Sequence, residues 1–92
     1  MEELEIIREK IREIDKDLIV LFEKRMALSR EVAVCKMKKQ MPVYDAGREE
    51  KNIRELSELL TDISDRPYFR KWYQMLMDVS KEKQRDTEKE EK

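Results

Sequence analysis

Residues 2–39 decide the fold, and they read EELEIIREKIREIDKDLIVLFEKRMALSREVAVCKMKK, with neither glycine nor proline. Apolar side chains recur along this stretch in steps of three and four, which is the spacing of one face of an α-helix. These positions are Leu4, Ile7, Ile11, Ile14, Leu18, Leu21, Phe22, Leu28, Val32 and Ala33. The pattern predicts a single long amphipathic helix.

Such a helix is too long for one subunit of this size. At 1.5 Å per residue it would span roughly 57 Å. A compact globule made from all 92 residues would be only about 32 Å across. Because the rest of the chain cannot cover the apolar stripe, we predict that a second copy covers it, in an obligate homodimer.

Two shorter helices are predicted after Pro42. Proline disfavours helical backbone at the residue before it, so Pro42 ends the first helix. Asp45 suits the N-cap of a second helix, and Pro67 suits the first position of a third. The side chains expected to face the core are Ile53, Leu56, Leu60 and Ile63 in the second helix, and Tyr68, Phe69, Trp72, Tyr73, Leu76 and Val79 in the third.

The chain is therefore expected to be all-α, with three helices in one domain. We assign residues 1–86 to this domain. Residues 87–92 read TEKEEK and carry no apolar side chain. Because a chain end without apolar anchors is poorly ordered, we expect these residues to form a charged, frayed tail.

Composition excludes several kinds of functional site. The chain has no histidine, one cysteine and one glycine, which excludes catalytic triads, Cys/His metal sites and glycine-rich phosphate loops. With 21 basic and 22 acidic residues the net charge is −1, so no global field favours nucleic acid. No apolar run approaches the roughly 20 residues of a membrane span. We expect no metal, no nucleic-acid partner and no membrane partner, and a single cysteine fits a cytoplasmic location.

Two cations, Arg25 and Lys36, lie beside the apolar stripe of the first helix. They are eleven residues apart, and at about 100° per residue they share one face, with Ser29 between them. A charge in such a place is costly unless it is paired or faces a ligand. Either the two side chains extend to water or to acids, or they form part of a binding site for an anion.

Arg8 lies roughly 25 Å along the helix axis from Arg25. It cannot share a small-molecule site with Lys36 of its own chain. In an antiparallel dimer the start of one first helix approaches the middle of the other, which would bring Arg8 to a site built from two chains. The alternative is an exposed Arg8 paired with Glu5 or Glu9.

Polar residues on the later helices suggest the rest of such a site. Arg48 lies near the positive end of the second helix, where a cation is mildly unfavourable but suits an anionic ligand. Ser80 and Gln84 are four residues apart and share a face of the third helix, although polar residues near a chain end are usually solvated.

Taken together, these positions resemble the all-helical chorismate mutases. The segment IREKIREIDKDLIVLFEKRMALSREVAVCK (residues 7–36) is similar to the first helix of that family, with its late lysine. PVYDAGREE (residues 42–50) is similar to the start of the second helix, and YQMLMDVSKEKQ (residues 73–84) to the end of the third. The resemblance extends from about Leu4 to Gln84.

The resemblance implies an intertwined homodimeric helical bundle with two equivalent sites, which converts chorismate to prephenate on the way to phenylalanine and tyrosine. It implies no cofactor, because the rearrangement is unimolecular. It implies that Lys36 and Gln84 are catalytic and donate hydrogen bonds to the ether oxygen of the breaking bond. The substrate-binding residues that it implies are Arg8 from the partner chain, Arg25, Asp45, Arg48, Glu49 and Ser80.

Two other functions stay open at this point. An isochorismate-pyruvate lyase of the same fold shares much of the cationic site, although Glu49 suits the hydroxyl of chorismate and favours the mutase. A non-enzymatic helical dimerisation module would explain the long helix, but it leaves Arg25, Lys36 and Arg48 without a role.

Overall fold

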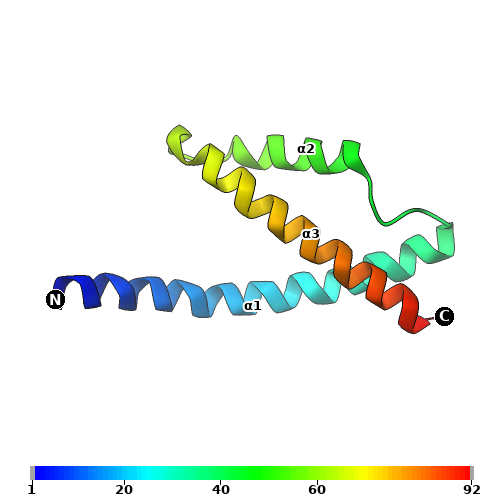
Figure 1. Cartoon of the computed structure of the whole chain (residues 1–92), viewed down its shortest axis with the longest axis horizontal. Coiled ribbons are helices and arrows are strands. Elements are labelled where there is room, and N and C mark those ends of the chain that lie inside the picture. The colour runs from blue at the N-terminus through cyan, green and yellow to red at the C-terminus, as the bar shows by residue number, and fades with distance from the viewer. Residues whose placement is uncertain (1, 92) are drawn as a thin grey trace.

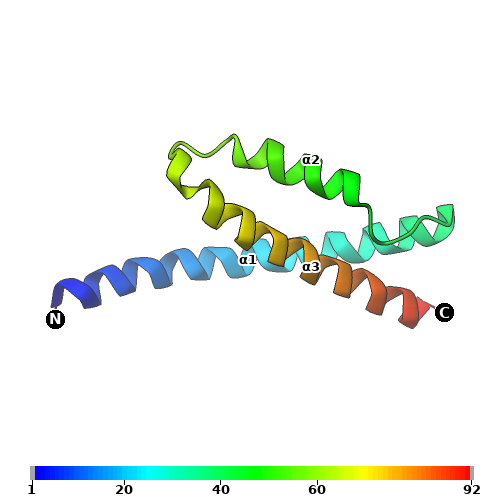
Figure 2. The same ribbon diagram turned by 45° about the horizontal axis from the view of Figure 1, so that its top comes forward.

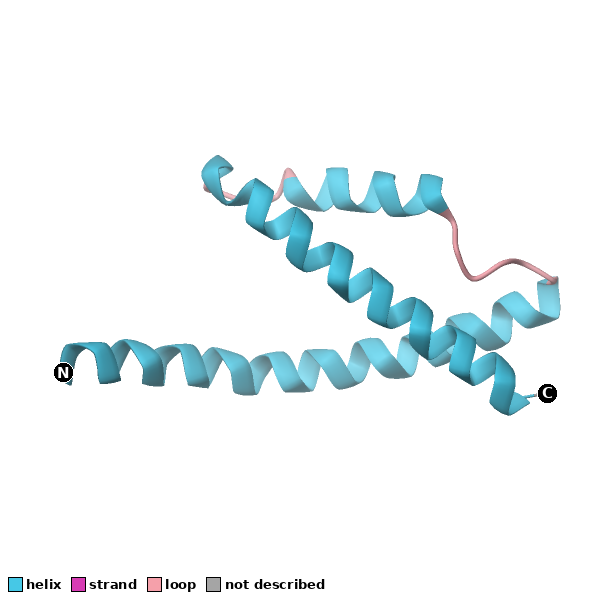
Figure 3. Ribbon diagram, viewed as in Figure 1, coloured by secondary structure: helices cyan, strands magenta, loops and turns pink. Residues whose placement is uncertain are grey.

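The computed structural model describes residues 2–91, which contain three α-helices, one short 3₁₀ helix and loops, but no strand (Figure 3). Helix α1 spans Glu2–Lys39, α2 spans Ala46–Ser57 and α3 spans Arg66–Glu91, with the 3₁₀ helix η1 at Ile63–Asp65. The prediction of an all-α chain with a long first helix is confirmed.

The chain is elongated because α1 is much longer than the other helices. The molecule measures 54 × 27 × 15 Å, and its radius of gyration is 16.6 Å, whereas a compact chain of this length would have about 12 Å. In Figures 1 and 2 the N-terminal end of α1 extends away from α2 and α3. Every residue from 2 to 24 is exposed.

The hydrophobic core of the single chain is small. Its buried apolar residues are Ala33 of α1, Ile53 of α2 and Met77 of α3. Several polar side chains are buried as well, namely Ser29, Ser57, Gln84 and Thr87. Some aromatic residues that were expected in the core are exposed, such as Tyr68 at 73% and Trp72 at 48%, because one chain offers them no covering surface.

Helix α1 ends in a left-handed turn at Gln40, which has φ = 55°. The Met41 N–H donates to the carbonyl oxygen of Lys36 (2.8 Å), and the Gln40 N–H donates to that of Met37 (3.2 Å). These two bonds form a Schellman motif, in which glycine usually takes the left-handed position. The chain then turns towards Pro42, which was correctly expected to lie beyond the end of the helix.

Replacing Gln40 by glycine should therefore stabilise the fold. We expect Gln40→Gly to raise the free energy of unfolding by roughly 0.5–1 kcal/mol, because a residue with a Cβ is strained in the left-handed region. Urea denaturation measures the gain, and Gln40→Ala is the matched control, since alanine carries the same Cβ. Equal stability of the two variants would contradict a left-handed residue 40.

The predicted N-cap of α2 is confirmed, but its predicted end is not. The Asp45 carboxylate accepts a hydrogen bond from the Arg48 N–H at 3.1 Å. At the other end α2 stops at Ser57, so Leu60 and Ile63 lie beyond it. Beyond Ser57 the backbone tightens, because the N–H groups of Leu59 and Leu60 donate to the carbonyl oxygens of Leu56 and Ser57, three residues earlier (3.1 and 3.3 Å). The Arg66 side chain also donates to the Ser57 carbonyl oxygen at 3.2 Å.

Helix α3 begins one residue before Pro67 and continues to Glu91, so residues 87–91 are helical rather than frayed. Thr87 is 1% exposed, and its hydroxyl donates to the Lys83 carbonyl. Arg30 of α1 forms ion pairs with Glu90 (2.7 Å) and Glu91 (2.9 Å), and its hydrogen bond and charge lower the pKa of Glu90. The ion pairs join the last turn of α3 to α1. Lys92, the last residue of the expected tail, lies outside the described residues.

Candidate active site

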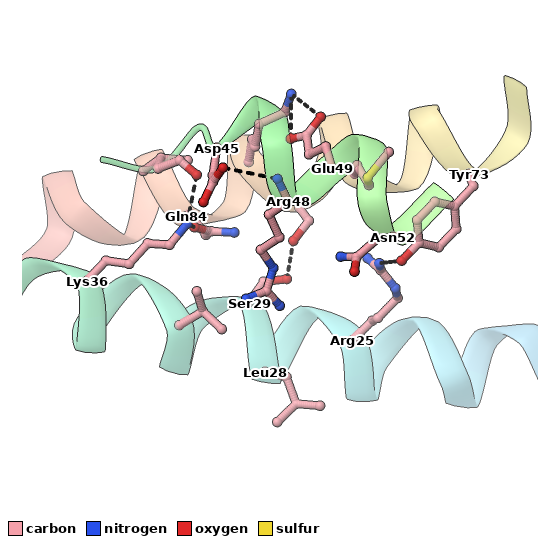
Figure 4. Close-up of a pocket in the computed structure, with 15 residues that line it drawn as sticks. Arg25, Leu28, Ser29, Lys36, Asp45, Arg48, Glu49, Asn52, Tyr73 and Gln84 are labelled. Carbon is pink, nitrogen blue, oxygen red and sulfur yellow. Dashed lines mark hydrogen bonds and ion pairs between the residues drawn. The ribbon is translucent and has the colours of Figure 1, made fainter. Parts of the chain in front are cut away.

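A cavity of about 240 Å³ lies where the three helices meet, between the C-terminal half of α1, the start of α2 and the later part of α3 (Figure 4). A few apolar side chains line it, including Leu28, Val32 and Met77. Most of its lining is polar and charged. This polar lining explains why so little apolar surface is buried between the helices.

Nearly all of the site residues predicted from sequence line this one cavity. They are Arg25, Lys36, Asp45, Arg48, Glu49, Ser80 and Gln84. The exception is Arg8, which is exposed on the N-terminal part of α1 and is not among the lining residues of the same chain. The fold thus gathers residues that are up to 59 positions apart in sequence, from Arg25 to Gln84.

Lys36 and Gln84 contact each other at one end of the cavity. The Lys36 ammonium donates to the Val43 carbonyl oxygen (2.7 Å) and to Oε1 of Gln84 (3.3 Å). An ammonium has three N–H donors, so one remains for a ligand. Because the oxygen of the Gln84 amide faces a group that only donates, the amide NH₂ is left to donate elsewhere.

Arginines from two helices approach the cavity from opposite sides. Arg25 of α1 donates to the Tyr73 hydroxyl at 3.3 Å, and its guanidinium carbon lies 5.5 Å from the centre of the Tyr73 ring. Arg48 extends from α2 towards α1, above Ser29 (Figure 4). Two guanidinium groups converging in this way are suited to bind carboxylates.

Two hydroxyl groups lie between the cations. The Oγ atoms of Ser29 and Ser80 are 2.6 Å apart and share a hydrogen bond that joins α1 to α3. Ser29 is only 5% exposed. Of the two hydroxyl protons, one is used in this bond and the other remains for a further acceptor.

Acidic groups define the remaining wall. The Glu49 side chain is 18% exposed, and its carboxylate pairs with the Lys81 ammonium at 3.0 Å. The Gln74 amide lies 3.4 Å from the same carboxylate. Burial lowers the pKa of Lys81, but its hydrogen bonds to Glu49 and Asp78 outweigh burial, and the net pKa is raised above that of a free lysine. Lys81 is therefore a stable cation beside the carboxylate.

Comparison with known protein families decides the identity of this arrangement. Residues 7–85 match the family model of chorismate mutase type II. The chain belongs to this family. It is accordingly a chorismate mutase, an isomerase, as the sequence resemblance implied. No curated protein and no solved structure gives a significant match to the chain.

The electrostatics of the cavity suit the substrate of a chorismate mutase. Chorismate carries two carboxylates, and the cavity is lined by four cationic side chains, Arg25, Lys36, Arg48 and Lys81, against the carboxylates of Asp45 and Glu49. Cationic side chains thus outnumber carboxylates in the lining, which favours the binding of a dianion. Fixed charges at a partly enclosed wall act more strongly than charges in water.

Neither a metal cluster nor a membrane-spanning helix is found in the described chain. Within residues 2–91, no three His, Cys, Asp or Glu side chains lie close enough together to hold a metal ion. None of the helices in that range has the length and apolar character needed to cross a membrane.

Sequence reasoning missed some residues that line the cavity, chiefly Asn52, Tyr73 and Lys81. For two of these residues, helical spacing from a predicted site residue could have indicated a place in the cavity. Asn52 follows Arg48 by four residues and shares its face of α2, and Tyr73 precedes Ser80 by seven, or about two turns of α3. Tyr73 was assigned to the core, yet its hydroxyl reaches Arg25. Lys81 carried no such signal, because its partner Glu49 is on another helix.

Proposed function

We propose that this cavity binds chorismate and rearranges it to prephenate, in the route to phenylalanine and tyrosine, and that the active unit is a homodimer. The observation that carries the proposal is the convergence of Arg25, Lys36 and Arg48 on one cavity with no strong nucleophile in it. A Claisen-type rearrangement needs neither a nucleophile nor a proton transfer. It needs the substrate to be held in its compact reactive conformer.

Lys36 and Gln84 are proposed to stabilise the transition state. As the C–O bond breaks, negative charge develops on the ether oxygen, and donors aimed at that oxygen lower the barrier. The third N–H of Lys36 and the amide NH₂ of Gln84 are suited to this role. Since charge-assisted hydrogen bonds are about twice as strong as neutral ones, Lys36 contributes more than Gln84.

The remaining site residues are proposed to bind the ground-state functional groups of chorismate. Arg25 and Arg48, with Ser80 beside them, bind a carboxylate. Glu49, supported by the Asp45 region, accepts a hydrogen bond from the ring hydroxyl. These contacts fix the orientation of the molecule, so that its two reacting ends meet.

Homodimer formation is supported by the surface of the single chain. The accessible area is 7715 Å², whereas a compact monomer of 11.3 kDa would expose about 5,700 Å². The excess of about 2,000 Å² per chain is in the range of obligate interfaces. It includes the apolar stripe of α1, with side chains such as Ile7, Ile11 and Ile14 each more than half exposed.

Arg8 completes the site only in such a dimer. It lies on the exposed part of α1, far from the cavity of its own chain. An antiparallel partner would bring its guanidinium to the other chain's cavity, where it binds a substrate carboxylate. Cytoplasmic location stays a prediction from composition.

Incubation of the purified protein with chorismate and, separately, with isochorismate tests the proposed reaction. We expect prephenate from chorismate, and little pyruvate or salicylate from isochorismate, because Glu49 is proposed to bind the ring hydroxyl of chorismate, and isochorismate carries its hydroxyl at a different ring position. Chromatography of the products with mass detection distinguishes the two outcomes. Rapid pyruvate release from isochorismate would instead identify a lyase, and no product from either substrate would leave only the dimerisation function.

A further inference from the structure

Lys81 is a largely buried cation to which the proposed mechanism assigns no contact with the substrate. Its side chain is 14% exposed and lies on α3 between Ser80 and Gln84. The ammonium contacts both oxygens of Glu49 (3.0 and 3.3 Å) and Oδ1 of Asp78 (3.3 Å). It also lies 4.5 Å from the centre of the Tyr44 ring.

We propose that Lys81 is a positioning residue. Its ammonium holds the Glu49 carboxylate at the cavity wall, in the orientation that accepts a hydrogen bond from the ring hydroxyl of the substrate. This inference rests on the proposed role of Glu49 in binding that hydroxyl. Lys81 thereby determines how well the enzyme recognises the hydroxyl without contacting it.

The geometry of Glu49 explains why it needs such a partner. A glutamate side chain is flexible, and apart from Lys81 its only hydrogen-bond partner among residues 2–91 is the Gln74 amide, at the long distance of 3.4 Å. Lys81 holds both carboxylate oxygens at once. Charge-assisted hydrogen bonds of this kind are among the strongest that side chains make.

Stability alone does not account for this ion pair. Removing two charges from water costs about as much as their attraction returns, so a buried ion pair is weak support for a stabilising role. Asp78 is the alternative partner of Lys81, but it is 54% exposed and lies three residues away on the same helix, where a surface pair contributes little.

The same lysine also connects α3 to the loop before α2. Its ammonium lies over the Tyr44 ring, in a cation–π contact. The neighbouring Val43 carbonyl accepts from Lys36. Lys36 and Lys81 thus contact adjacent residues of the loop that leads into α2.

A double-mutant cycle on chorismate mutase kinetics tests the inference, using Lys81→Met, Glu49→Ala and the double variant. Methionine keeps the length and apolar stem of lysine and removes its charge. We expect each single change to lower kcat/KM roughly tenfold or more. The double variant should be no worse than Glu49→Ala within about a factor of two, because Lys81 acts through Glu49.

Two further variants separate positioning from a merely structural role. Lys81→Arg keeps a cation that pairs with carboxylates, and we expect it to restore kcat/KM to within about fivefold of the wild-type value. Asp78→Asn, the matched control, removes the exposed partner of Lys81 and should change kcat/KM by less than about twofold. If circular dichroism shows that Lys81→Met is unfolded, Lys81→Gln takes its place in the cycle.

The possible failures are distinguishable. Additive losses in the double variant, or a Lys81→Met enzyme with wild-type kinetics, would overturn the inference about Lys81 while leaving the role of Glu49 intact. Wild-type kinetics in Glu49→Ala would overturn the proposed role of Glu49 and the inference together.

Discussion

Lys36→Ala is expected to lower kcat for the conversion of chorismate to prephenate by about 10²–10³-fold or more, with little change in helical content. Removal of one preorganised donor to a developing oxyanion costs about 3–4 kcal/mol of barrier, and a charged donor belongs at the upper end. Because the charge on the ether oxygen develops mainly in the transition state, kcat should fall more than KM rises. Continuous absorbance assays of chorismate consumption measure both constants.

Lys38→Ala is the matched control for this loss. Lys38 is two residues away on α1, is exposed and does not line the cavity. Its replacement by alanine should leave kcat within about twofold of the wild-type value, because substitution of an exposed surface charge usually has a small effect. If Lys36→Ala kept kcat within tenfold of the wild-type value, the proposed oxyanion stabilisation would be wrong.

Mixing two inactive variants, Arg8→Ala and Lys36→Ala, is expected to restore activity. In a mixed dimer with sites shared between chains, one site receives an intact Arg8 from one chain and an intact Lys36 from the other. The second site carries both defects. With equal mixing and full exchange, half of the dimers are mixed and half of their sites intact, so activity should reach about a quarter of the wild-type value.

The control for this experiment pairs two defects that lie in the same chain's part of the site. Arg25→Ala and Lys36→Ala both affect α1 residues that line one cavity, so every site of their mixed dimer carries one defect and no recovery is expected. Exchange is verified by mass spectrometry of tagged subunits. Absence of recovery for Arg8→Ala with Lys36→Ala, despite verified exchange, would show that Arg8 does not act across the dimer.

The features that depend on local interactions were predictable from the sequence. The length of α1 follows from apolar spacing and from the lack of glycine and proline, and the start of α2 follows from the capping carboxylate of Asp45. The common face of Arg25 and Lys36 follows from helical geometry alone. Each of these depends on residues that are near one another in the chain.

Features that depend on contacts between helices were not predictable in the same way. Arg66 donates to the Ser57 carbonyl oxygen at the end of α2, and Arg30 of α1 pairs with Glu90 near the end of α3. Lys81 was missed because the angle at which α3 crosses α2 decides that it meets Glu49. The residue spacing within one helix cannot predict the angle at which two helices cross.

The small core has a consequence for how the folded chain responds to its ligand. Where a typical domain has packed hydrocarbon, this one has a cavity in which cations repel one another. A bound dianion would neutralise that repulsion and fill the cavity. The substrate should therefore stabilise the folded enzyme. Above the dissociation constant, each tenfold rise in free ligand should then add about 1.4 kcal/mol to the stability of the native state.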